Sequence, residues 1–181
     1  MKYEATKLVM PQGHMVTVSG KLIDLFKPDP ALITLEDIAH GLSNICRWNG
    51  HTKSFYSVAE HSFRVAKLVQ PSKRLTALLH DAEEAYWGDV ISPLKKLYPA
   101  MTEAMVSFRQ VIFDKFNVPA IDSEVCKADE DEMYWDYENQ IQSFKHVGLH
   151  PIKAKQYWLK AVQMHQVGNQ INNQVNQHLP L

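Results

Sequence analysis

The sequence predicts an all-α, single-domain protein with a small β-hairpin near its N-terminus. Apolar side chains recur at helical spacing through most of the chain, and capping residues or prolines open several of these stretches. Glycine is also scarce, because the 181 residues contain 7, whereas average usage of roughly 7% would give about twelve or thirteen. A chain of this length buries roughly 70% of the surface that its unfolded form exposes, so its size alone requires neither a disulfide nor a structural metal.

The first thirty residues differ from the rest of the chain. Residues 15–18 and 21–26 are two β-type runs on either side of Ser19-Gly20, which predicts a short hairpin. No internal repeat, linker or coiled-coil heptad divides the remainder. The expected organisation is an N-terminal extension over residues 1–30, a helical domain over 31–167 and a polar, Asn/Gln-rich tail over 168–181.

Local start and stop signals divide the helical domain into helices. Thr34 and Ser57 each stand three residues before an acidic residue, as in a capping box. Ser72 is the expected cap of the next helix, which continues until Gly88. The expected helices cover residues 35–46, 58–69, 73–87, 92–98, 101–116, 123–137 and 151–167.

The charge balance limits the kinds of partner. The chain has 19 Lys plus Arg against 20 Asp plus Glu, a formal net charge of -1, which argues against a basic nucleic-acid-wrapping protein and against an acidic disordered chain. Cys46 and Cys126 form neither a disulfide framework nor a C-x-x-C motif, which indicates a reducing compartment. Because no apolar leader or membrane-length apolar run occurs, we expect a soluble, cytoplasmic protein.

Two histidines and two aspartates give the strongest chemical signal. His80 and Asp81 are adjacent, His61 lies on the preceding predicted helix, and Asp129 lies on an otherwise apolar stripe of a later one. Adjacent helical residues point about 100° apart, so His80 and Asp81 reach one ion together only near a helix edge. A buried carboxylate also needs a partner to offset its desolvation. A divalent metal ion would be that partner, because imidazole and carboxylate are common metal ligands.

The alternative for these four residues is a salt-bridged core network. Such a network needs cations on the facing helices, and the surrounding stripes are apolar, which favours a metal. Two further acids, Glu84 and Asp89, lie close in the sequence. On a continuous helix Glu84 would sit one turn beyond His80, where a carboxylate can orient water or take its proton. Asp89 follows the helix end and could position the same water or assist the leaving oxygen.

The motifs resemble a known family. The order of His61, His80-Asp81 and Asp129 on a helical chain is similar to that of the HD-domain metal-dependent phosphohydrolases. The segment Tyr-Ser-Val-Ala-Glu-His-Ser at residues 56–62 resembles the 5'-deoxynucleotidase branch of that superfamily and its phage relatives. So does the downstream series Glu84, Asp89, Pro93 and Lys95. The resemblance covers about residues 20–160.

This resemblance implies an HD-domain helical bundle and a role for each motif residue. His61, His80, Asp81 and Asp129 would be the metal ligands, and Glu84 and Asp89 the catalytic pair. Four other residues would contact the substrate. Arg47 would bind phosphate oxygens through its guanidinium fork, Lys95 would add a charge there, Trp48 would stack on the nucleobase, and Pro93 would pack against the sugar.

The resemblance also implies an enzyme that hydrolyses phosphoric esters, with a metal-activated water attacking the α-phosphorus of a deoxynucleotide. Small phage relatives hydrolyse dATP to deoxyadenosine and triphosphate, so dATP is the expected substrate. A deoxynucleoside 5'-monophosphate, as used by 5'-deoxynucleotidases, is the alternative. A triphosphate needs more cations than Arg47 alone, and Lys95, Lys96 or Lys127 are the expected sources. A phage origin would place the protein in the host cytoplasm.

Cofactors and partners follow from the same comparison. Two histidines and two aspartates suit Zn, Co or Mn, and also Fe or Ni, and Mg would accompany a triphosphate. Relatives assemble into dimers or larger rings, so we expect a homo-oligomer of two to six chains, with the aromatic-rich helix after Pro151 as one interface. No stable nucleic acid or membrane partner is expected. Because no Walker-type or G-x-G-x-x-G motif occurs, side chains and the ion must hold the phosphate.

The sequence leaves other functions open, and most of the other histidines and acids have simpler explanations. A metal-stabilised nucleotide sensor and a purely structural helical protein remain open, while an HD phosphodiesterase would need a second set of histidine ligands. His51 lies in an expected loop and is a candidate substrate contact. The remaining histidines are expected to be structural or exposed: His14, His40, His146, His150, His165 and His178. Solvated faces are expected for Glu83, Glu130, Asp131 and Glu132.

Overall fold

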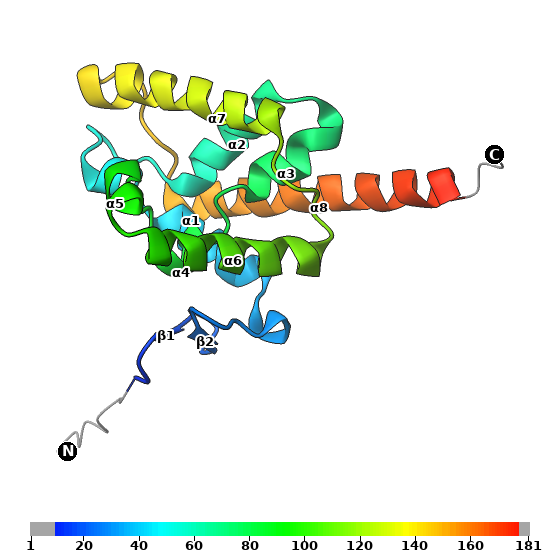
Figure 1. The fold of residues 1–181 in the computed structure, drawn as a ribbon. Helices are drawn as coiled ribbons and strands as arrows, with labels where there is room; N and C mark the ends of the chain where they lie inside the picture. Colours follow the sequence, from blue (N-terminus) through cyan, green and yellow to red (C-terminus); the bar gives the residue numbers. More distant parts are fainter. Residues whose placement is uncertain (1–9, 178–181) are drawn as a thin grey trace, which may run out of the picture.

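Helices form most of the structure, and a short antiparallel hairpin precedes them (Figure 1). The computed structural model describes residues 10–177, with side chains as far as residue 166. The strands are β1 (His14–Val16) and β2 (Leu22–Asp24). The α-helices are α1 (Leu35–Asn44), α2 (Val58–Leu68), α3 (Arg74–Leu79), α4 (Glu84–Trp87), α5 (Ser92–Leu97), α6 (Pro99–Phe116), α7 (Ser123–Asp136) and α8 (Pro151–Gln177). The 3₁₀ turns are η1 (Pro30–Leu32), η2 (Trp48–Gly50) and η3 (Pro71–Lys73), and η4 (Tyr137–Gln142) is a π-helical turn.

The predicted all-α class with an N-terminal hairpin is therefore confirmed. Residues 1–9 of the expected extension, residues 178–181 of the expected tail and His178 itself lie outside the described residues. No helix among the described residues combines the length and the apolar character needed to cross a membrane.

The hairpin is fastened to α1 by one buried aspartate. The backbone N–H and the hydroxyl of Ser19 both donate to the Asp37 carboxylate, at 3.2 and 2.8 Å. Thr34, the N-cap of α1, donates to the same carboxylate at 2.8 Å and accepts from the Asp37 N–H at 3.2 Å. Ile23 of β2 is fully buried and extends the core toward the hairpin. Asp37 therefore joins the N-terminal segment to the start of the first helix.

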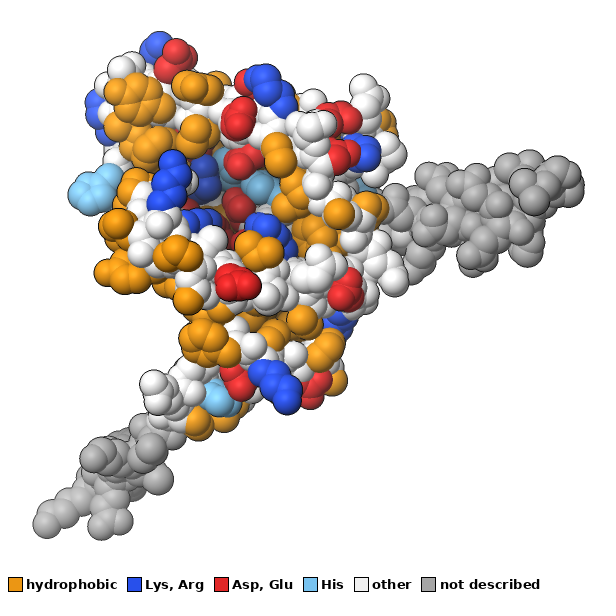
Figure 2. All heavy atoms as spheres, in the orientation of Figure 1, with side chains coloured by type: hydrophobic (Ala, Val, Ile, Leu, Met, Phe, Trp, Pro, Cys, Tyr) orange, Lys and Arg blue, Asp and Glu red, His pale blue; other side chains and the backbone are white. Residues whose placement is uncertain are grey.

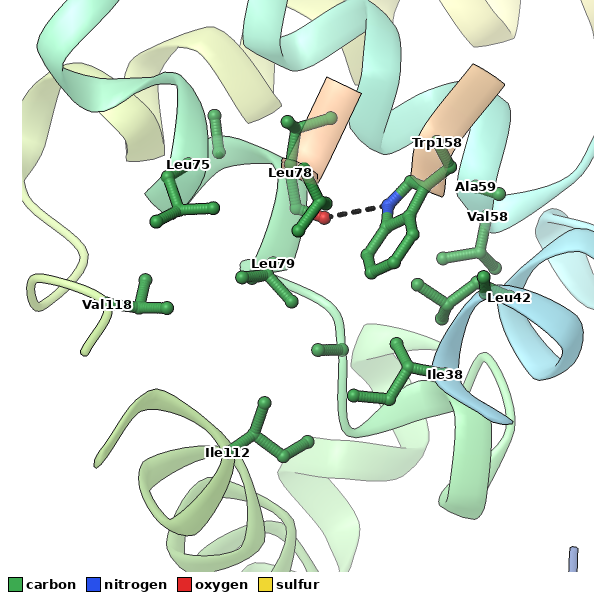
Figure 3. Packing of buried hydrophobic residues seen from close by; sticks show 14 of the residues in the cluster. Ile38, Leu42, Val58, Ala59, Leu75, Leu78, Leu79, Ile112, Val118 and Trp158 are labelled. Atoms are coloured by element: carbon green, nitrogen blue, oxygen red, sulfur yellow. Dashed lines mark hydrogen bonds between the residues drawn. The ribbon is translucent and has the colours of Figure 1, made fainter. Parts of the chain in front are cut away.

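The predicted helix over residues 73–87 is wrong, because the chain leaves the helix at Leu79 and starts a new one, α4, at Glu84. The indole N–H of Trp158 donates to the Leu78 carbonyl at 3.0 Å (Figure 3). The Ala82 N–H reaches only three residues back, to the Leu79 carbonyl, also at 3.0 Å. These contacts satisfy carbonyl groups that have no partner within a helix that ends here. The sequence could not show them, since Trp158 is distant in the chain.

Other boundaries also differ from the prediction. Ser72 lies inside η3 and does not cap α3, and α6 begins at Pro99, two residues earlier than expected. The last helix does not end at Gly168 but continues to Gln177, so it projects past the other helices (Figure 1). A glycine inside a helix costs only about 1 kcal/mol, which need not end a helix of this length.

The core is built by residues of α1, α2, α3, α6 and α8, and Trp158 is one of its largest members (Figure 3). Trp158 is fully buried, and Ile38, Leu42, Val58 and Leu79 surround it from the other helices. The adjacent Tyr157 is 48% exposed. The aromatic residues after Pro151 were expected at an oligomer interface, but the larger of them is a core residue.

Burial alone would raise the pKa of the Asp37 carboxyl, but hydrogen bonds from Ser19 and Thr34 outweigh burial and hold the pKa below its usual value. A carboxylate with a lowered native pKa stabilises the fold above its unfolded pKa of about 3.9, and that contribution is lost as the pH falls through the native pKa.

We predict that Asp37→Asn lowers the free energy of unfolding by about 2 kcal/mol at neutral pH, because the hydrogen bonds lose their charged acceptor. Urea denaturation measures this loss, which should narrow as the pH falls below about 4, because the unfolded carboxyl then protonates while the native one stays ionised until a lower pH. Glu103→Gln, at an exposed position on α6, is the control and should leave stability unchanged. A loss that stays constant down to acid pH would contradict the prediction.

Candidate metal centre and adjoining pocket

The structure brings the four predicted metal ligands together from three parts of the fold. His61 lies on α2, whose start is fixed by the Ser57 hydroxyl accepting from the Glu60 N–H at 3.2 Å. Nε2 of His61 lies 3.0 Å from Oδ1 of Asp129 on α7. Nε2 of His80 lies 3.1 Å from Oδ2 of Asp81 and 3.6 Å from the same Asp129 oxygen. One nitrogen or oxygen from each of His61, His80 and Asp81 lies within 4.8 Å of the others.

The break after α3 resolves the orientation problem posed by two adjacent ligands. On a continuous helix, His80 and Asp81 would point about 100° apart. Both instead lie in the turn between α3 and α4, which lets both side chains face the same point. His80 is also fixed by its backbone neighbour, since its Nδ1 lies 2.7 Å from the Ala77 carbonyl oxygen. A carbonyl only accepts, so Nδ1 carries a proton and Nε2 is the nitrogen that faces the two carboxylates.

A buried aspartate that the sequence analysis missed supports His61. Asp136 is fully buried, and its Oδ2 lies 3.5 Å from Nδ1 of His61, on the side of the ring away from Asp129. Arg47 donates to the same Asp136 oxygen from Nε and Nη2, both at 3.3 Å. Asp136 stands seven residues after Asp129 and so returns to the same face of α7, which is a signal the sequence did contain.

These groups fit a divalent cation. The buried Nε2 of His80 has no hydrogen-bond partner among the described residues. Burial alone would raise the pKa of the Asp81 and Asp129 carboxyls, but the imidazoles beside them hold both pKa values below the usual range. Two ionised carboxylates and two imidazole rings therefore converge, and these are the ligand types that a Zn-like or Mn-like ion takes once it displaces the ring protons. Histidines that bind a metal commonly donate their other ring N–H to a carboxylate. Asp136 lies on that side of His61.

The prediction that no cation lies beside the candidate metal ligands was wrong. The apolar stripes predicted that no cation faces this group, but Nη1 of Arg47 lies 3.8 Å from Oδ2 of Asp81, in addition to the contact of Arg47 with Asp136. Asp129, in contrast, pairs only with imidazoles among the described residues. The metal interpretation therefore depends on Asp129 and the free His80 nitrogen, and no longer on an absence of cations.

His61, His80, Asp81 and Asp129 are called the candidate metal group below. A cavity of about 390 Å³ adjoins it. Figure 2 shows the corresponding hollow, in which acidic, basic and histidine side chains gather within a largely apolar face. Asp81 and Asp129 form part of its wall. The predicted catalytic and substrate-binding residues all line it as well: Arg47, Trp48, Glu84, Asp89, Pro93 and Lys95.

Glu84 enters this cavity from the first turn of α4. Its side chain is almost fully buried, and Oε1 accepts from the Lys95 ammonium at 3.1 Å, while Oε2 has no partner among the described residues. Burial, together with the charges of Asp81 and Asp89, raises the pKa of the Glu84 carboxyl well above its usual value. Glu84 therefore lines the same cavity as Asp81 and Asp129, although no continuous helix connects His80 to Glu84.

Asp89 holds the loop that carries the predicted phosphate and base contacts. Its Oδ2 accepts from the backbone N–H of Trp48 at 3.1 Å. Trp48 and Asn49 have left-handed backbone conformations, with φ of 56° and 53°. Burial raises the pKa of the Asp89 carboxyl, and the positive charge of Arg47 partly opposes that effect.

Several expectations about the remaining charged residues need correction. Glu83 and Glu132 were expected on solvated faces but are buried, paired with Arg109 and Arg64 respectively. Burial raises the pKa of Glu83 to about 7, despite the opposing charge of Arg109. The acids Glu130 and Asp131 are exposed, as expected.

The remaining candidate contacts do not line the cavity. His51 is exposed and is absent from the wall. Lys96 is exposed and Lys127 pairs with Asp131, and neither is among the residues that line the cavity. His146 has a structural contact, since its Nε2 lies 2.7 Å from Oε1 of Glu60.

We predict that the purified protein retains about one divalent transition-metal ion per chain and that Asp129→Asn abolishes this retention, because a ligand charge is lost. Elemental analysis after dialysis measures the ion. Asp131→Asn, two residues away and exposed, is the matched control. A chelator should also lower the melting temperature of the unsubstituted protein, since an ion at a hundredfold excess over its Kd stabilises by about 2.7 kcal/mol. Equal metal content in both variants would contradict the site.

We further predict that Asp136→Asn weakens metal affinity by about 10- to 100-fold, because the amide no longer orients His61 as a carboxylate does. Competition with a fluorescent chelator measures the affinity. Glu138→Gln, at an exposed position just beyond α7, should change nothing. Unchanged affinity in the Asp136 variant would show that Asp136 acts only as a partner of Arg47.

No family model matches the chain. The uncharacterized protein YfdR of Escherichia coli (strain K12) is 40% identical over 111 residues, which are 61% of this chain and 62% of YfdR. The uncharacterized protein RCAP_rcc00048 of Rhodobacter capsulatus is 40% identical over 125 residues, 62% of each chain. The matched segments thus span less than two thirds of either relative. The chain is similar to these two bacterial proteins, whose names state no activity.

Proposed function

We propose that this protein is a metal-dependent deoxynucleotide phosphohydrolase. The observation that carries the proposal is the composition of one cavity. Two carboxylates of the candidate metal group, a buried glutamate with a free oxygen, and two cations suited to phosphate all line the same space of about 390 Å³. A cavity of this size lies within the range of small-molecule sites.

His61, His80, Asp81 and Asp129 would hold the ion. When bound, a divalent ion supplies Lewis acidity toward a phosphoryl oxygen and lowers the pKa of water. The rest of the chemistry falls to the protein. Because its pKa is raised and Oε2 is free, Glu84 can hold a proton or take one from water. The ammonium of Lys95 fixes the orientation of that carboxyl through Oε1.

The cavity also supplies contacts for the two ends of a nucleotide. Arg47 and Lys95 offer donors to phosphate oxygens, and the guanidinium of Arg47 is already held in place by Asp136. Trp48 and Met133 offer flat and apolar surface to a base, and Pro93 offers it to a sugar. Together with the HD-like motif order, these contacts support dATP as substrate, cleaved to deoxyadenosine and triphosphate.

The charges in the cavity favour a second candidate. Four carboxylates line it, Asp81, Glu84, Asp89 and Asp129, against two cations that are themselves paired with acids. With all four carboxylates ionised, one divalent ion and the two cations together would only neutralise the negative charge of this wall. A monophosphate needs fewer additional cations than a triphosphate, so the observation supports 5'-deoxynucleotidase activity as the alternative. A triphosphate would require Mg to accompany it.

The two activities are separated by their products. We expect protein loaded with Mn, Co or Zn to convert dATP to deoxyadenosine and triphosphate in equal amounts, as resolved by anion-exchange chromatography. A 5'-deoxynucleotidase would leave the dNTPs intact and release inorganic phosphate from dNMPs. Release of inorganic phosphate alone from dATP would exclude the triphosphohydrolase, and no turnover of any dNTP or dNMP would exclude both.

For whichever substrate is cleaved, we predict that Glu84→Gln lowers kcat by at least about 100-fold, because the amide cannot exchange a proton with water. Metal content should stay unchanged in this variant, which separates a loss of chemistry from a loss of the ion. Glu130→Gln, at an exposed position on α7, is the matched control and should retain full activity. Activity within a few-fold of the unsubstituted protein would remove Glu84 from the reaction.

A further inference from the structure

A second cavity, of about 210 Å³, lies where α2, α3 and α8 meet. On α2 it is lined by Phe63, Ala66 and Lys67. At about 100° per residue these positions lie roughly 140–240° around the helix from His61. The cavity is therefore on the side of α2 turned away from the candidate metal group, and it shares no lining residue with the first cavity.

The wall of this second cavity combines apolar and basic side chains. Ala66, Leu78 and Ala161 supply aliphatic surface, and the ring of Phe63 lies 4.5 Å from the Lys67 ammonium. Arg74, His165 and Lys67 supply the basic groups. These three basic residues come from three different helices, so tertiary packing has gathered them.

No acid offsets these charges within the described part of the chain. The wall contains no carboxylate, and neither Lys67 nor Arg74 has a carboxylate oxygen within 4.0 Å. Nε of Arg74 is buried and has no hydrogen-bond partner among the described residues. A buried guanidinium N–H without an acceptor costs free energy. Burial and the positive charge of Arg74 together lower the pKa of His165, as expected for basic groups gathered without an anion.

We propose that this cavity binds a compact oxyanion carried on an apolar group, such as an aromatic carboxylate or phosphate monoester. The anion would accept from Arg74 and Lys67, which satisfies the free Nε, and the apolar group would lie against Phe63 and Leu78. The size is suitable, because a cavity of roughly 150 Å³ holds a benzene ring, and this one leaves additional space for a charged group. The site is independent of the nucleotide cavity and of the function proposed for it.

The test uses the full-length protein and calorimetric titration with three probes: benzoate, phenyl phosphate and inorganic phosphate. We expect both aromatic anions to bind more tightly than inorganic phosphate, because only they cover the apolar wall. Arg74→Met should weaken aromatic-anion binding by about tenfold or more. Ala161→Met should do the same without a charge change by filling the cavity, which keeps the test valid if the arginine variant folds poorly.

Two controls locate the binding. Lys160→Met removes one exposed charge from the same helix and should leave binding unchanged. Lys95→Met removes a cation of the first cavity, and binding should survive it. Binding that is lost in the Lys95 variant but kept in the Arg74 variant would assign the anion to the nucleotide cavity and overturn the proposal. Absence of aromatic-anion binding, or equal affinity for inorganic phosphate, would also overturn it.

Discussion

The hydrogen bond from the Trp158 indole to the Leu78 carbonyl is the interaction on which the candidate site depends. Carbonyls in the last turn of a helix have no partner within that helix, and a buried one needs a partner from elsewhere. Trp158 supplies it from within the core, so α3 can end at Leu79 without leaving that group unpaired. The next two residues, His80 and Asp81, lie in the turn before α4, where Nε2 of His80 lies 3.1 Å from Oδ2 of Asp81.

The turn after α3 brings acidic side chains close together, and their negative charges repel one another. Asp81, Asp129 and Asp136 all approach the same imidazole of His61, and Glu84 enters from the next helix. Like charges at this spacing repel strongly in a partly buried site. Arg47 offsets two of them and Lys95 a third, which leaves Asp129 opposite imidazoles alone. A chain with a net charge of only -1 therefore contains a local excess of negative charge where a divalent cation would be most stabilising.

Signals between neighbouring residues in the sequence predicted the helix starts and the turn that depend only on those neighbours. Thr34 and Ser57 cap the helices that they were expected to cap, and the turn at Ser19-Gly20 gives the hairpin. The residue types of His61, His80, Asp81 and Asp129 also identified a group that the fold brings together. Contacts between distant segments were not predictable in this way. The break after Leu79 depends on an indole 80 residues away, and the acids Glu83 and Glu132 are buried because Arg109 and Arg64 reach them from other helices.

The loop that carries Arg47 holds two non-glycine residues in strained backbone conformations beside the cavity. Trp48 and Asn49 occupy left-handed conformations that cost non-glycine residues of the order of 1 kcal/mol or more each. Two anchors hold the loop in this form: the Arg47 guanidinium contacts Asp136, and the Trp48 N–H donates to Asp89. A glycine at position 48 would relieve the strain there but would remove an aromatic side chain that lines the cavity. The strain at Trp48 is therefore explained by the placement of its side chain in the cavity wall, next to the guanidinium of Arg47.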